Sequence, residues 1–237
     1  MISTDNKQKS ENESESKMNA FRIIADMFLS PVDAMKRVVL KKRLFIPFLI
    51  IFVGTLLFVS LNFQAFSHLI KQNIEMGIAQ NNAPVSQDQI NAMANIFSYV
   101  GVVLFPLIAV VSWLLISLIF FAFVRLFKGQ ASYSQVLSIA GMAYVVKLVF
   151  YLLSCISGLF TGELYVNFSL ALLALDKKGQ FIYGLLRGIE LFDIWYFSLI
   201  GTGIYVLTKL DKKKIILVTS LIFIGYVLLG ASNMKNF

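Results

Sequence analysis

The sequence predicts an all-α membrane protein, a polytopic bundle of five transmembrane helices preceded by cytosolic amphipathic helices. Of its 237 residues, 58% are hydrophobic and only 14% are charged, whereas soluble domains carry about 25% charged residues. The mean hydropathy is +0.76. The basic residues lie at the ends of long apolar runs, as the positive-inside rule expects. The net charge of +8 therefore indicates orientation in a membrane, and no nucleic-acid partner is expected.

Five apolar stretches are long enough to cross a bilayer. A helix rises about 1.5 Å per residue, so about 20 apolar residues span a hydrocarbon core of about 30 Å. The expected spans are residues 44–63, 96–124, 129–162, 194–208 and 215–234. Residues 164–175 are also apolar, but as a helix they reach only about 18 Å. We therefore expect this segment to be interfacial or re-entrant and to pack against the bundle.

The lysine and arginine residues predict the orientation of the five spans. With a cytosolic N-terminus, the basic residues on the inner side are Lys36, Arg37, Lys41, Lys42, Arg43, Arg125, Lys128, Lys209, Lys212, Lys213 and Lys214. Those on the outer side are fewer, namely Lys71, Lys177, Lys178, Arg187 and Lys235. A sixth span would move Lys209 and its basic neighbours to the outer side. The asymmetry therefore favours five spans.

Aromatic residues near the ends of the spans are expected to anchor them at the head groups, where an amphipathic ring is favoured. These residues are Tyr99, Tyr133, Tyr165, Trp195, Tyr196 and Tyr226. Trp113 is the exception, because it lies within a span.

Three regions follow from the composition. Residues 1–19 are polar and of mixed charge, so we expect a disordered tail. Residues 20–43 are expected to form juxtamembrane amphipathic and basic helices, and residues 44–237 the transmembrane domain.

The juxtamembrane region has a helical pattern. Its apolar residues recur at the spacing of one helix face, namely Phe21, Ile24, Ala25, Phe28 and Leu29, which predicts a helix lying along a surface with Arg22 and Asp26 on its other face. Ser30, Pro31 and Asp33 then predict the capped start of a second helix. Basic residues at its end are expected to contact the membrane surface, namely Lys36, Arg37, Lys41, Lys42 and Arg43. Each contributes about 1 kcal/mol close to an anionic leaflet. Topology and anchoring are favoured over a specific lipid or protein docking site.

Residues 64–95 are predicted to be the largest outer loop, in which Ser86 and Gln89 have the spacing of a capping box and predict a short helix before the second span. The single histidine, His68, is expected to be solvated. The sequence contains no phosphate-binding Gly loop, zinc-protease motif or nucleophile elbow. One His and one Cys, Cys155, exclude a zinc site, a triad and an internal disulfide. We therefore expect no enzymatic activity, no metal and no cofactor.

Ionisable residues in or beside the spans form a candidate intramembrane polar cluster: Lys147, Glu163, Arg187, Glu190 and Asp193. A bare charge at the bilayer centre costs roughly 3 kcal/mol, so Lys147 needs a partner. Arg187, Glu190 and Asp193 are spaced by three residues and would share a face if the fourth helix began near Phe181. Asp193 would then approach Lys147. A static pair that fixes helix register is favoured over a polar path for ions, protons or lipid head groups.

Glycine residues with short spacings predict close helix approach in this region and beyond. The three pairs are Gly158 and Gly162, Gly184 and Gly188, and Gly201 and Gly203, of which the last would thin one face of the fourth span. Packing within the chain is favoured. A homo-oligomer or other membrane proteins remain alternatives as partners, beside membrane lipids with anionic head groups.

Three segments occur in a characteristic order: residues 28–35 (FLSPVDAM) before a basic stretch and Pro47-Phe48, residues 127–137 (FKGQASYSQVL), and residues 191–195 (LFDIW). In this respect the chain resembles, from residue 21 to about residue 230, the bacterial branch of the YIP family, named for eukaryotic relatives that interact with Ypt/Rab GTPases. The resemblance implies a five-span bundle in the bacterial cytoplasmic (inner) membrane with a cytosolic N-terminus. Eukaryotic members take part in vesicle budding and Golgi traffic. Their aspartate-containing motif has no clear copy here, so a Rab-related function is not carried over.

The expected function is therefore that of a non-enzymatic integral membrane protein that organises or scaffolds the cytoplasmic membrane. The alternative is a small transporter, channel or lipid-translocating protein that uses Lys147, Glu190 and Asp193.

Overall fold

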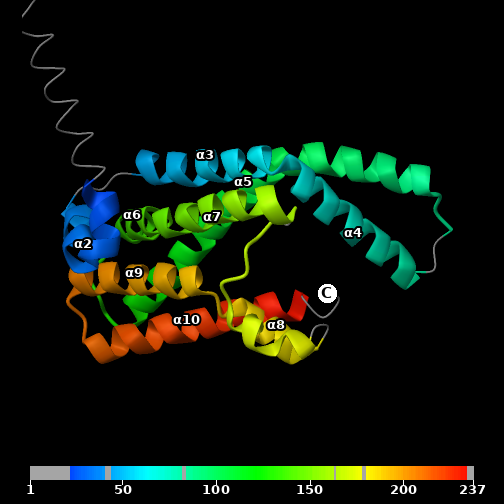
Figure 1. The fold of residues 1–237 in the computed structure, drawn as a ribbon. Coiled ribbons are helices and arrows are strands. Elements are labelled where there is room, and N and C mark those ends of the chain that lie inside the picture. The colour runs from blue at the N-terminus through cyan, green and yellow to red at the C-terminus, as the bar shows by residue number, and fades with distance from the viewer. Residues whose placement is uncertain (1–21, 41–43, 82–83, 163, 178–179, 234–237) are drawn as a thin grey trace, which may run out of the picture.

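Helices make up almost the whole fold, which is known from a computed structural model (Figure 1). The structure describes residues 22–40, 44–81, 84–162, 164–177 and 180–233. Within these residues there is no β-strand, and an isolated β-bridge joins Ser169 to Glu190. The expected all-α class is therefore confirmed. The polar tail expected over residues 1–19 lies outside the described residues.

Four helical stretches among the described residues are long and apolar enough to cross a membrane. They are α5 (Gln87–Leu126), α6 (Tyr133–Ala143) joined to α7 (Val145–Thr161), α9 (Leu191–Thr208) and α10 (Lys212–Asn233). A fifth candidate is the pair α3 (Phe45–Leu61) and α4 (Phe63–Asn81), which is bent by 83°. With 17 residues, α3 alone is at the lower limit of about 17 residues for a spanning helix. The chain is therefore a multi-pass bundle in which each expected span corresponds to a helix or a helix pair.

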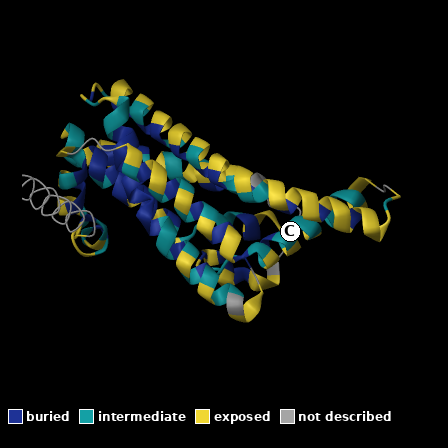
Figure 2. Cartoon of the chain, turned by 90° about the horizontal axis from the view of Figure 1, so that it is seen from above, coloured by how far each residue is buried: buried dark blue, intermediate teal, exposed yellow. Residues whose placement is uncertain are grey.

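The two ends of the bundle differ in charge. At the end drawn on the left of Figure 1, α3, α6 and α10 begin, α5 and α9 end, and α2 (Pro31–Leu40) packs across α9 and α6. The described lysine and arginine residues at these helix ends define what we name the basic end: Lys36, Arg37, Arg125, Lys128, Lys209, Lys212, Lys213 and Lys214. The opposite end carries η1 (Leu170–Lys177) and α8 (Phe181–Gly188). Figure 2 shows that buried residues gather in the half nearer the basic end.

Residues 64–95 do not form the expected loop. Most of them belong to α4, which packs along the first part of α5 to form a helical hairpin that projects beyond the opposite end (Figures 1 and 2). At the bend the side chain of Asn62 donates to the carbonyl of Phe58 and to Sγ of Cys155, both at 2.8 Å. The expected capping box of Ser86 and Gln89 is confirmed.

The helix that this capping box starts is longer than expected. It continues without a break into the span and has 40 residues, so α5 is about 60 Å long, twice the thickness of a hydrocarbon core. The polar composition of this region predicted a loop, because a polar segment has little apolar surface to bury by itself. In the structure α4 packs along the first part of α5 and supplies the partner that stabilises it as a helix.

The juxtamembrane helices pack into the bundle and do not simply lie on a surface. Helix 22–29 and α2 contribute Ile23, Met27, Met35 and other residues to the main core. The expected apolar face was only partly right, because Ile24 and Phe28 pack against the core as expected. In contrast, Ile23 and Met27 are buried, and Leu29 is 81% exposed. The side chain of Phe28 stacks on Trp195 of α9, with ring centroids 5.9 Å apart. The buried face of helix 22–29 is therefore determined by its contacts with neighbouring helices, which the spacing of apolar residues in the sequence does not reveal.

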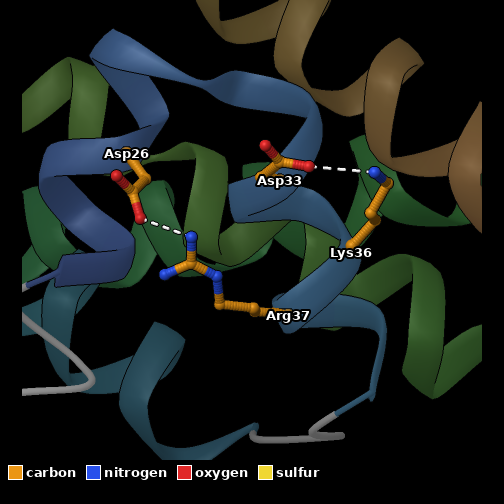
Figure 3. Close-up of polar contacts among 4 residues, drawn as sticks. All are labelled: Asp26, Asp33, Lys36 and Arg37. Atoms are coloured by element: carbon orange, nitrogen blue, oxygen red, sulfur yellow. Dashed lines mark hydrogen bonds and ion pairs between the residues drawn. The ribbon is translucent and has the colours of Figure 1, made fainter.

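Two ion pairs of different environment hold this region (Figure 3). The guanidinium of Arg37 in α2 lies 2.6 Å from Asp26 of helix 22–29, and the Asp26 side chain is only 18% exposed. Asp26 was expected on the face opposite the apolar residues of a helix lying along a surface, but its carboxylate is largely buried against α2. Within α2, Lys36 lies 2.9 Å from Asp33, and both side chains are exposed. The hydrogen bond and charge of Lys36 lower the pKa of Asp33. Lys41, Lys42 and Arg43 lie outside the described residues.

Arg37→Gln is expected to loosen helix 22–29. The variant leaves the half-buried carboxylate of Asp26 without its charged partner, which costs about 1–3 kcal/mol. Limited proteolysis with a protease that cleaves after aromatic residues should cut several times faster near Phe28. The matched control is Lys36→Gln, which removes an exposed pair and should change stability by no more than about 0.5 kcal/mol. Equal cleavage of both variants would contradict this role of Arg37.

The apolar segment 164–175 does not form a spanning helix. It begins as irregular backbone and continues as the 3₁₀ helix η1, which packs against α8. Backbone hydrogen bonds run from the N–H of Leu170 to the carbonyl of Ile189 (3.1 Å) and from the N–H of Leu191 to the carbonyl of Phe168 (3.2 Å). Neighbouring protein thus satisfies backbone groups that lipid could not.

Candidate functional site

The ion pair between Lys147 and Asp193 joins two spans. Lys147 lies in the first turn of α7, just after the break at Tyr144, and Asp193 lies in the first turn of α9. The ammonium of Lys147 contacts Oδ1 of Asp193, and the Asp193 side chain is buried whereas that of Lys147 is partly buried, with exposed fractions of 7% and 14%. The position of Asp193 also suits it to the positive end of the helix dipole.

Aromatic residues complete the surroundings of this pair. The hydroxyl of Tyr226 in α10 donates to Oδ2 of Asp193 at 3.2 Å. Nζ of Lys147 lies 5.9 Å from the ring centroid of Tyr196. The hydroxyls of Tyr144 and Tyr151 are 3.0 Å apart. Three helices, α7, α9 and α10, therefore meet at one buried polar group.

The pair borders a cavity of about 210 Å³, which we name the ion-pair cavity. It is lined by Phe105, Ile108, Ala109, Ser112, Trp113, Ile116, Tyr144, Lys147, Tyr151, Asp193, Tyr196, Phe197 and Tyr226. Among these described lining residues, Lys147 and Asp193 carry the formal charges. The wall is otherwise aromatic and apolar, with tyrosine hydroxyls as its main polar groups.

Packed aromatic rings lie on the side of the cavity toward the basic end, and the lining of the cavity reaches the side of the bundle. One turn further along α5, the buried ring of Phe120 packs against Phe197 of α9, with centroids 6.2 Å apart. In contrast, Ile108 and Ser112 belong to the lining and are exposed on the surface of α5, Ile108 by 60%. The lining therefore connects the ion pair with a lateral surface of the bundle.

Trp113 holds one wall of the cavity in place. Its indole N–H donates to the carbonyl of Leu137 in α6 at 2.9 Å, and its side chain is buried. This contact explains why a tryptophan occurs within a span rather than at the head groups.

The other candidate residues of the polar cluster have different positions. Glu190 lies just before α9, and burial raises the pKa of its carboxyl, which the positive charge of Lys147 partly opposes. Arg187 is exposed in the last turn of α8. Glu163 lies outside the described residues. The structure therefore brings Lys147 and Asp193 together. Glu190 lies close enough to Lys147 for their charges to interact.

One expectation about this cluster was wrong. Arg187, Glu190 and Asp193 do not share one face of a helix beginning near Phe181, because α8 ends at Gly188 and α9 begins at Leu191. The break arises where Glu190 adopts extended backbone and bridges to Ser169. Asp193 reaches Lys147 nevertheless, from the first turn of α9.

Sequence reasoning missed the tyrosines of the cavity. Tyr196 and Tyr226 were expected as anchors at the head groups, yet both line the ion-pair cavity. Tyr144 and Tyr151, seven residues apart, also face it from the α6–α7 stretch. A signal was present, since seven residues are about two helical turns and place both rings on the face that carries Lys147.

The comparisons with known proteins place the chain in a family. The Yip1 domain matches residues 25–232, which is most of the chain and includes every described residue of the ion-pair cavity. No curated protein and no solved structure matches the chain. Because the match covers far more than half of the sequence, the chain belongs to the Yip1 domain family of membrane proteins.

Proposed function

We propose that this protein is a non-enzymatic integral membrane protein that organises the cytoplasmic membrane, with its N-terminus in the cytosol and its basic end against the inner leaflet. The proposal is supported by one observation above all, the gathering of most of the described helix-end lysines and arginines at the basic end of the bundle. Anionic lipids of the cytoplasmic leaflet attract such residues by about 1 kcal/mol for each Lys or Arg.

The packing of α2 strengthens this proposal. Ala34, Met35 and Val38 are buried in the main core, so Lys36 and Arg37 stand on a docked helix and not on a free arm. A basic surface of fixed shape can hold several anionic head groups in a fixed arrangement. The bundle would thereby bind a particular set of lipids around itself. This is what we mean by organising the membrane.

Neutralising the basic end is expected to weaken the association with anionic lipid. Lys212, Lys213 and Lys214 are exposed at the start of α10, so their combined change to glutamine should remove up to about 1 kcal/mol of attraction per lysine. The measurement is the fraction of spin-labelled phosphatidylglycerol, against spin-labelled phosphatidylcholine, that is immobilised by the protein in vesicles.

The control changes basic residues at the opposite end, Lys71→Gln with Arg187→Gln, and should leave the preference for phosphatidylglycerol unchanged. If the wild-type protein shows no such preference, or if the control reduces it equally, the basic end does not organise lipid.

A second candidate function, transport through the membrane, is supported by the ion pair and its cavity. The packed rings of Phe120 and Phe197 weigh against a water-filled path from the cavity to the basic end. In proteoliposomes we therefore expect ion flux and lipid scrambling no faster than in protein-free vesicles. Transport that disappears in both Lys147→Met and Asp193→Asn, with folding intact, would replace the scaffolding function.

A further inference from the structure

The ion-pair cavity has a polar interior whose wall extends to the lipid-facing side of α5. Lys147, Asp193 and the tyrosine hydroxyls form the interior, whereas Ile108 and Ser112 are exposed at its edge. A ligand that enters from the side of the bundle would first contact the exposed surface of α5 and then reach the charged groups of Lys147 and Asp193. This arrangement suits an amphiphile rather than a solute that arrives from water.

The size of the cavity limits the part of a ligand that it can hold. Pockets for drug-sized molecules measure about 300–1,000 Å³, and this cavity measures about 210 Å³. It therefore accommodates a head group, while any acyl chains remain outside. Four exposed apolar residues, at the spacing of one helix face, run along α5 beside the cavity edge: Leu104, Ile108, Val111 and Leu115. This stripe provides the surface on which acyl chains can lie.

The charge of the lining selects the kind of head group. Lys147 and Asp193 neutralise each other, so an anionic head group would add an uncompensated negative charge in a poorly hydrated site, and a cation would add a positive one. Both are costly because buried charge requires a partner. A zwitterion adds no net charge, since its phosphate can pair with Lys147 while its ammonium pairs with Asp193.

The tyrosines supply contacts for both parts of such a zwitterion. The hydroxyl of Tyr196 is buried and has no hydrogen-bond partner among the described residues, so it is available as a donor. The hydroxyl of Tyr226 already donates to Oδ2 of Asp193 and so helps to hold this carboxylate in place. Tyrosine ring faces also attract ammonium groups.

From these observations we propose that the ion-pair cavity binds the zwitterionic head group, ammonium and phosphate, of a membrane phospholipid that enters sideways past Ile108 and Ser112. The lipid phosphate pairs with Lys147, its ammonium pairs with Asp193, and its acyl chains lie along the exposed stripe of α5. This site is separate from the basic end, so it goes beyond the proposed function.

The test blocks the edge of the cavity without touching the ion pair. Ser112→Phe fills the edge, and its matched control is Val103→Phe, which lies on the same helix, is also exposed, and belongs neither to the lining nor to the exposed stripe. The full-length protein in detergent is titrated with phosphatidylethanolamine, phosphatidylglycerol and soluble phosphoethanolamine, and bound molecules are counted by native mass spectrometry. Ile108→Trp serves as a second blocking variant where Ser112→Phe does not fold.

We expect the blocking variant to weaken phosphatidylethanolamine binding about tenfold or more, a change of about 1.4 kcal/mol, and to leave phosphatidylglycerol binding unchanged. Val103→Phe should bind both lipids as the wild-type protein does. The glutamine variant of Lys212, Lys213 and Lys214 should do the reverse of the blocking variant and weaken only phosphatidylglycerol binding. The proposed lipid binding at the basic end and in the ion-pair cavity can therefore be disproved independently of each other.

Three results would overturn the proposal. The first is a blocking variant that binds phosphatidylethanolamine normally. The second is an equal loss of phosphatidylglycerol, which would make the ligand anionic. The third is phosphoethanolamine binding as tightly as the lipid and lost on blocking, which would mean that a soluble zwitterion enters and that the acyl chains contribute nothing.

Discussion

Lys147→Met is expected to lower the free energy of unfolding by about 3–5 kcal/mol, the range found when one partner of a buried ion pair is removed. The carboxylate of Asp193 would then retain the hydroxyl of Tyr226 as its hydrogen-bond donor, 3.2 Å away, but no cation. The contact between α7 and α9 would lose its electrostatic attraction at the same time. Thermal unfolding of the purified protein in detergent, followed by circular dichroism, measures the loss.

A double variant separates pairing from simple loss of a lysine. Lys147→Met combined with Asp193→Leu removes both charges, and such replacements are often neutral or stabilising, so the double variant should recover most of the stability. Lys71→Met is the matched control, because its pair with Glu75 is partly exposed and such pairs contribute about 0–1 kcal/mol. A Lys147→Met protein as stable as the wild type would show that the two side chains are hydrated and not mutually dependent.

The recovered stability would have a further meaning. If the apolar double variant is as stable as the wild type, the ion pair is not needed to hold the helices together. A polar pair that faces a cavity would then be explained better by a ligand than by helix register. Phosphatidylethanolamine binding by the double variant is the decisive measurement, and we expect it to be lost while stability is kept.

Gly141→Ala is expected to destabilise the bundle by about 1–3 kcal/mol, as overpacking of a close-packed core does. A Cβ atom at this position of α6 would lie 2.4 Å from Cβ of Pro47 and 2.9 Å from the ring of Trp113. Neither neighbour can yield easily, since the proline ring is rigid and the indole is held by its hydrogen bond to Leu137. The same thermal unfolding measurement applies.

The matched control is Gly225→Ala in α10, where a Cβ atom would meet no other atom within 4 Å. This substitution should be neutral or stabilise the helix by up to about 1 kcal/mol, because alanine is the better helix former. Equal destabilisation by both substitutions would show that α3, α5 and α6 do not approach as closely at Gly141 as the structure indicates.

Gly201 and Gly203 illustrate how much local sequence leaves open. The pair was expected to thin one face of the fourth span, but Gly201 faces Thr219 of α10, whereas Gly203 faces Ile139 of α6 and Met35 of α2. Residues at positions i and i+2 of a helix are about 200° apart around the helix axis. The two glycines therefore admit neighbours on nearly opposite sides of α9.

The sequence by itself determined which apolar segments form the candidate spans and that basic residues gather at their ends, and it offered Asp193 as a candidate partner of Lys147. These features depend on local composition and on the cost of an unpaired charge in lipid, both of which can be estimated without knowing the neighbours.

Tertiary structure alone decided which side of each helix meets protein. It buried Met27 and Met35 in the core, joined the polar segment after Asn62 to α5 as a hairpin, and turned Tyr196 and Tyr226 from the expected head-group region into the cavity. The physical reason is that apolar side chains are equally soluble in lipid and in a protein core. Hydropathy therefore reports that a residue avoids water, whereas only the packing of neighbouring helices determines whether it contacts lipid, protein or a ligand.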